Sequence, residues 1–149
     1  ACGTGYHEAT QLCLEALERW LRPGDTLLDV GTGSGILAEA SLLLGASRAI
    51  GCDIDPEAVL YARQRTRAHL FAGSLRAVRD AAADTLVANI NQVTIVAMAA
   101  GIRRVLKPGG RAILSGFRAG ELAEVDHAIS LPRLDLLELQ GWSCLVCGR

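Results

Sequence analysis

The chain has 149 residues, of which 50% are hydrophobic and only 4% aromatic, and its formal net charge is −1. This length suits one domain with a core built mainly from aliphatic side chains. The near-neutral balance predicts no basic face of the kind that nucleic acid requires. No apolar run approaches the roughly 18 residues that a membrane-spanning helix needs. The composition therefore argues against nucleic acid and membranes as partners.

Five cysteines are scattered through apolar stretches. An odd and dispersed set is typical of reduced thiols, and it predicts a cytoplasmic protein. Cys144 and Cys147 have the spacing of a zinc or redox pair, but they lie in an apolar run and no second pair accompanies them. We therefore predict that they pack in the core and that the chain holds no metal site.

Short β-rich segments alternate with helical segments along most of the chain. The predicted helices cover residues 6–21, 35–44, 56–67, 92–106 and 120–130. The predicted strands cover residues 26–30, 48–52, 69–72, 85–89, 111–115, 134–139 and 142–146, with a loop or one helical turn at 75–83. This alternation predicts a mostly parallel sheet with helices on both faces. Because only a short turn separates the last two strands, they must pair antiparallel.

A glycine-rich turn, Asp29-Val-Gly-Thr-Gly-Ser-Gly35, follows the first predicted strand and opens a helix. This is the context of a nucleotide-type cofactor turn, because glycines let a ligand approach the backbone and the helix amides face it. The preceding acid and the GxGxG spacing favour S-adenosylmethionine (AdoMet). A reductase that uses a nicotinamide cofactor is the alternative.

Two further polar side chains stand where predicted strands end. Asp53 ends the second strand, where an acid can accept hydrogen bonds from ribose hydroxyls. Asp55 precedes Pro56 and is better placed to cap the next helix, although the two acids could exchange these roles. Asn89 ends the fourth strand, beside the expected switch in strand order, where ligands of such sheets bind. A lone Asn there could also be a simple turn former.

These motifs belong to a longer set that runs through almost the whole chain: GTGYHEAT at 3–10, residues 12–17, DVGTGSGIL at 29–37, GCDIDPEAV at 51–59, VANI at 87–90, and residues 114–116 and 142–149. Together they resemble the PrmA family of bacterial ribosomal-protein lysine methyltransferases. The sequence departs from the family pattern at Cys2, where the family has Phe, and at Ala9, where it has Thr. Asn89-Ile-Asn91 also lacks the Pro-Pro-aromatic tail of methyltransferases that act on adenines or glutamine.

The resemblance implies a Rossmann-like class I methyltransferase fold with a seven-stranded, mostly parallel sheet. It also implies AdoMet as cofactor, S-adenosylhomocysteine as product, and methyl transfer to a lysine of a protein such as a ribosomal protein. The predicted cofactor-binding set, part of which comes from the resemblance, is Thr4, His7, Thr10, Asp29, Gly31, Thr32, Gly33, Asp53, Ile54, Ser74 and Asn89. Asn89 is also the predicted catalytic residue, which orients the attacking amine.

The resemblance also predicts that residues 1–149 form a single methyltransferase domain, without the family's separate N-terminal substrate-recognition domain. The chain would then be either a fragment or a stand-alone relative with another substrate. Two alternatives remain open on the sequence: a small-molecule methyltransferase with the same fold, and a non-catalytic interaction module.

Overall fold

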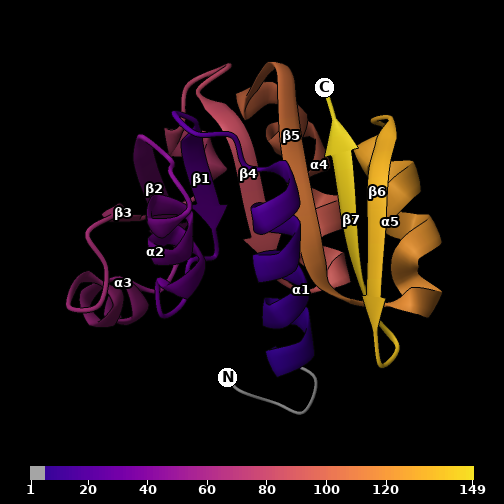
Figure 1. Cartoon of the computed structure of the whole chain (residues 1–149), viewed down its shortest axis with the longest axis horizontal. Helices are drawn as coiled ribbons and strands as arrows, with labels where there is room; N and C mark the ends of the chain where they lie inside the picture. Colours follow the sequence, from indigo (N-terminus) through magenta and orange to yellow (C-terminus); the bar gives the residue numbers. More distant parts are fainter. Residues whose placement is uncertain (1–5) are drawn as a thin grey trace.

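The computed structural model describes residues 6–149 and shows one sheet of seven strands with helices on both faces (Figure 1). The strands are β1 (Thr26–Val30), β2 (Arg48–Asp53), β3 (His69–Ala72), β4 (Ala83–Asn89), β5 (Leu106–Arg118), β6 (Arg133–Leu139) and β7 (Trp142–Gly148). The helices are α1 (Tyr6–Trp20), α2 (Ile36–Leu43), α3 (Pro56–Arg63), α4 (Gln92–Val105) and α5 (Leu122–Ile129), with short 3-10 helices η1 (Leu75–Ala77) and η2 (Ala119–Glu121).

The strand order is β3-β2-β1-β4-β5-β7-β6. Every neighbouring pair is parallel except those that involve β7, which runs antiparallel to both β5 and β6. The predicted fold class is thereby confirmed, including the antiparallel closing hairpin. The order reverses between β1 and β4, which is the point where open α/β sheets bind their ligands.

The core is divided by the sheet into two layers. Helices α1 and α2 cover one face and α4 and α5 the other (Figure 1). Side chains alternate along the central strands, so Val87 and Ile113 face α1 while Leu86 and Leu114 face α4. All of these side chains are fully buried. Strands β4 and β5 are therefore apolar on both faces, as central parallel strands require.

Several predicted boundaries were wrong, and distant residues explain those of α3 and β5. Helix α3 ends at Arg63, not at 67. The Glu39 carboxylate of α2 accepts hydrogen bonds from the Thr66 hydroxyl and the Arg67 N–H, which draws this segment out of the helical path. Strand β5 is longer than predicted because β7 pairs with it as far as Arg118 and its first residue, Leu106, pairs with β4.

The predicted core packing of the last two cysteines is confirmed. Cys144 and Cys147 are buried in β7, and burial raises the pKa of Cys147 to about 12, which keeps its thiol protonated. Across residues 6–149, no group of three or more His, Cys, Asp or Glu side chains could hold a metal ion. None of the helices in this described range is long and apolar enough to cross a membrane.

Candidate functional site

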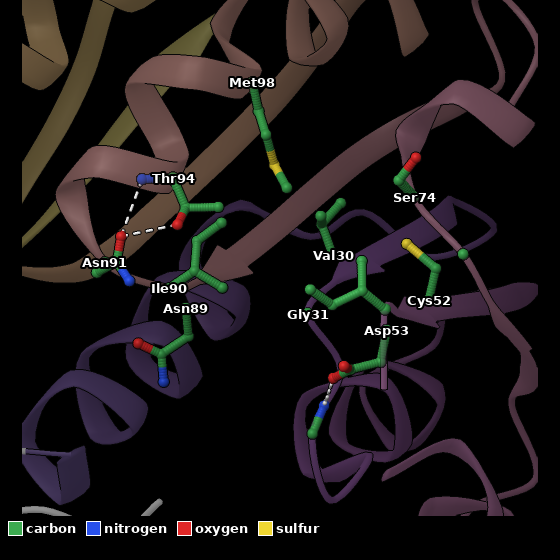
Figure 2. Close-up of a pocket in the computed structure, with 13 residues that line it drawn as sticks. Val30, Gly31, Cys52, Asp53, Ser74, Asn89, Ile90, Asn91, Thr94 and Met98 are labelled. Atoms are coloured by element: carbon green, nitrogen blue, oxygen red, sulfur yellow. Dashed lines mark hydrogen bonds between the residues drawn. The ribbon is translucent and has the colours of Figure 1, made fainter. Parts of the chain in front are cut away.

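A pocket of about 350 Å³ lies where β1, β2 and β4 end, at the switch in strand order (Figure 2). Its walls come from the glycine turn, from the ends of β2 and β4, from the loop after β3, and from the first turns of α4. The lining residues are Val30, Gly31, Gly33, Cys52, Asp53, Ile54, Gly73, Ser74, Asn89, Ile90, Asn91, Thr94 and Met98. Three segments that the sequence singled out separately therefore meet in one cavity.

Backbone hydrogen bonds hold the glycine turn against the end of β2. The N–H groups of Gly31 and Thr32 both donate to the Cys52 carbonyl, each at 2.9 Å. Gly31 has φ +72°, and a Cβ at this position would stand 2.7 Å from Cγ2 of Ile90. Glycine is therefore required here, because β1 and the segment after β4 approach too closely for a side chain.

Asp29 and Thr32 stabilise this turn through a buried hydrogen bond between their side chains. Asp29 is 1% exposed, and the Thr32 hydroxyl donates to its carboxylate at 2.8 Å. Burial raises the pKa of Asp29 to about 7, although hydrogen bonds from Thr32 and the Ala38 N–H lower it in part. Neither residue belongs to the pocket lining. Direct contact of Asp29 or Thr32 with a cofactor stays a prediction.

The two acids after β2 take different roles. The Asp53 carboxylate faces the pocket and accepts hydrogen bonds from the N–H groups of Gly33 and Asp55, each at 3.0 Å. Asp55 caps α3, because its Oδ1 accepts the Glu57 N–H at 2.9 Å, as predicted. Each oxygen of Asp53 accepts one hydrogen bond here and can accept another. Asp53 is therefore the acid that is available to a ligand.

Asn89 connects the end of β4 to α1. Its Nδ2 donates to the Thr10 hydroxyl at 3.1 Å, which fixes the orientation of the amide. No residue in the described part of the chain donates to Oδ1 of Asn89, so this oxygen can accept a hydrogen bond from a ligand in the pocket. The structure thus joins two predicted site residues that lie far apart in the sequence.

The remaining predicted residues lie in different surroundings. Ile54 is 80% exposed at the pocket, and Ser74 lines it while its hydroxyl accepts the Arg76 N–H at 3.3 Å. His7 is exposed in the first turn of α1. Thr4 lies outside the described residues. The contacts predicted between these side chains and a cofactor stay predictions.

Sequence reasoning missed several lining residues, among them Gly73, Asn91, Thr94 and Met98. Thr94 and Met98 are four residues apart, a spacing that places both on one face of α4. Because α4 follows β4 directly at the pocket, this spacing could have predicted that Thr94 and Met98 line it together. Asn91 could have been noticed because it follows Asn89 by two residues and caps the helix that begins at Gln92.

The chain matches known proteins over its full length. Residues 1–149 match the family described as ribosomal protein L11 methyltransferase (PrmA). The ribosomal protein L11 methyltransferase of Burkholderia cenocepacia is 44% identical over 155 residues, and that of Burkholderia vietnamiensis 43%. Both alignments cover 100% of this chain and 51% of the relative, so the chain spans about half the length of these curated relatives.

Solved structures show the same fold. The crystal structure of a ribosomal protein L11 methylase from Lactobacillus delbrueckii subsp. bulgaricus has a TM-score of 0.90 and 29% identity, and it covers 96% of this chain and 79% of that one. A Burkholderia thailandensis 1,6-didemethyltoxoflavin-N1-methyltransferase with bound S-adenosylhomocysteine has a TM-score of 0.75 at 20% identity, covering 98% of this chain and 84% of that one. The second likeness concerns the fold alone. The chain has the class I methyltransferase fold and belongs to the ribosomal protein L11 methyltransferase (PrmA) family.

Proposed function

We propose that this protein binds AdoMet in the pocket between β1, β2 and β4 and transfers its methyl group to an amine of a protein, ribosomal protein L11. The convergence of the glycine turn, Asp53 and Asn89 on one pocket carries this proposal. Family membership supports the substrate, because the curated relatives are named for L11. Residues 1–149 would form the catalytic unit, and a ribosomal substrate would place the protein in the cytoplasm.

The residues present fit AdoMet. Asp53 can accept hydrogen bonds from the two ribose hydroxyls, because both of its oxygens keep acceptor capacity. Gly31 and Gly33 leave the backbone accessible to the amino-acid part of the cofactor. Ile54 offers an exposed apolar surface at the pocket to a flat base. The cavity volume also lies within the ordinary range for cofactor sites.

Bound AdoMet supplies the electrophilic methyl group, and the protein supplies position. The free Oδ1 of Asn89 can accept an N–H of the incoming amine and direct its lone pair into the pocket. An amide does not take up a proton at neutral pH, so the amine must release its proton to solvent before it reacts. Good alignment of the nucleophile and the methyl group lowers the activation barrier of such a reaction by several kcal/mol.

Replacement of Asp53 tests the cofactor site. We expect Asp53→Ala to weaken AdoMet binding by about 1–3 kcal/mol, because the hydrogen bonds to ribose are lost. Calorimetric titration measures this, with NADH as the comparison ligand. Asp55→Ala is the matched control: it removes a helix cap, costs about 1 kcal/mol of stability and leaves AdoMet affinity unchanged. A wild-type chain that bound NADH and not AdoMet would contradict the proposal.

Replacement of Asn89 tests the catalytic assignment. We expect Asn89→Ala to lower kcat about tenfold or more while it changes the free energy of unfolding by only about 1 kcal/mol. Methyl transfer to L11 and urea unfolding are measured on the same preparations. Equal losses of activity and stability would show that Asn89 is structural. A protein that bound AdoMet and transferred no methyl group would instead be a non-catalytic module.

A further inference from the structure

Asn91 presents a fixed hydrogen-bond donor at the mouth of the pocket. Its Oδ1 accepts both the N–H of Thr94, at 2.9 Å, and the Thr94 hydroxyl, at 2.8 Å. These two bonds determine which way the amide is turned, so Nδ2 faces away from α4. Figure 2 shows this nitrogen on the side of the pocket where Asn89 lies. Within the described range, no residue accepts a hydrogen bond from it.

The backbone that carries Asn91 is held from two sides. The Ile90 N–H donates to the Ser115 carbonyl at 3.0 Å. Gly116 has φ +98°, and a Cβ there would stand 2.2 Å from the Ile90 carbonyl oxygen, so β5 lies directly against this segment. The Ile90 side chain also packs closely over Gly31, where a Cβ would stand 2.7 Å from its Cγ2. Asn89 and Asn91, on either side of Ile90, are therefore held in a constant relative position.

Together the two amides offer an acceptor and a donor to the same ligand. Oδ1 of Asn89 suits an N–H of an amine, whereas Nδ2 of Asn91 suits a carbonyl oxygen and cannot serve an ammonium group. Asp53 and Gly31 lie across the pocket from this pair (Figure 2). Asn91 is also exposed, so a chain that approaches the pocket can reach its amide.

We propose that Asn91 is a substrate-binding residue whose Nδ2 donates a hydrogen bond to a peptide carbonyl of the methyl-accepting protein. This inference rests on the proposed function and extends it, because it assigns the recognition of the acceptor's main chain to this side chain. An acceptor amine that carries no neighbouring carbonyl gains nothing from Asn91. The pair therefore favours peptides over simple amines.

The variant Asn91→Asp isolates the donor, because Asp still accepts both bonds from Thr94 and remains a good helix cap. We expect Asn91→Asp to raise about tenfold both the Kd of L11 for the S-adenosylhomocysteine-loaded protein and the KM for L11. AdoMet affinity and thermal stability should stay near wild type. Val93→Asp is the charge control, since it adds a carboxylate at a neighbouring position that is 71% exposed. Thr94→Ala weakens the cap but keeps the donor.

The possible outcomes distinguish a failure of the Asn91 contact from a failure of the proposed function. An L11 affinity within twofold of wild type in Asn91→Asp would overturn the inference, as would equal effects of Val93→Asp. An equal loss of AdoMet affinity would assign the donor to the cofactor and overturn it too. A wild-type protein that bound AdoMet but not L11 would overturn the proposed substrate together with this contact. No AdoMet binding at all would overturn the proposed function and the inference built on it.

Discussion

The two ends of the central strands differ in whether their charged side chains form ion pairs. At the amino end, Arg111 of β5 donates to Asp25 at 2.8 Å, and both residues are less than 10% exposed. At the carboxyl end, burial and then the charge of Asp53 raise the pKa of Asp29, and within residues 6–149 neither carboxylate forms a salt bridge. The buried charges at the amino end are paired with each other, whereas the Asp53 carboxylate in the pocket keeps acceptor capacity on both oxygens.

Asp25 is held by several hydrogen bonds and by a cation at the amino end. One of its oxygens accepts hydrogen bonds from the Arg22 N–H, the Thr85 hydroxyl and the Arg111 guanidinium. Arg111 also donates to the Gly109 carbonyl, and burial lowers its pKa. The desolvation of both ions is thus offset by several hydrogen bonds. These bonds connect Asp25 to Thr85 of β4 and Arg111 of β5, so the buried pair supports the fold at the amino end.

The largest expected effect comes from a break in this buried pair. Arg111→Met leaves the Asp25 carboxylate buried without its cation, and we expect it to lower the free energy of unfolding by about 3–5 kcal/mol. Urea denaturation measures the loss, and AdoMet affinity should stay within about twofold of wild type. The double variant Asp25→Asn with Arg111→Met should recover most of the stability. A large loss of AdoMet affinity in the still-folded single variant would contradict the division between the two ends.

A smaller effect is expected at Asp29, on the carboxyl end. Because its pKa is raised to about 7 in the folded protein, the native state binds a proton that the unfolded chain releases near its ordinary value of 3.8. The stabilisation is complete below about pH 4 and is lost as the pH rises through 7. Asp29→Asn should abolish this dependence, so that its stability relative to wild type rises by about 3 kcal/mol between pH 5 and pH 8. Parallel urea titrations at both pH values measure this, and identical pH slopes would count against a raised pKa.

The smallest effect is expected at Lys107, which belongs to the amino end but is more exposed. Its ammonium group lies 3.3 Å from Asp84, and the two side chains are 40% and 31% exposed. Asp84 also accepts the Thr26 N–H at 2.9 Å and stays solvated if Lys107 is removed. Lys107→Met should therefore cost about 0.5 kcal/mol, a loss that salt would also produce. A loss as large as that in Arg111→Met would show that position along the sheet matters more than burial.

The sequence predicted those features whose causes are local. The glycine turn and the cap at Asp55 each follow their own strand and open the next helix, and Asp53 is recognised by its place at the end of β2. Period-two and helical patterns likewise predicted the type of most elements, because alternating burial follows directly from backbone geometry. The resemblance to the PrmA family added the cofactor and the expected acceptor, and the match over residues 1–149 confirmed that family.

Contacts between distant segments decided the rest. The end of α3 depends on Glu39 of α2, and the length of β5 depends on its pairing with β7. The bond from Asn89 to Thr10 joins residues 79 positions apart, and the pair of Arg111 and Asp25 joins residues 86 apart. No local pattern encodes such pairs, because their energies arise only when the sheet brings the segments together. The sequence alone therefore determined the fold class and the cofactor turn, whereas the tertiary structure decided which polar groups are satisfied by the protein and which remain free for a ligand.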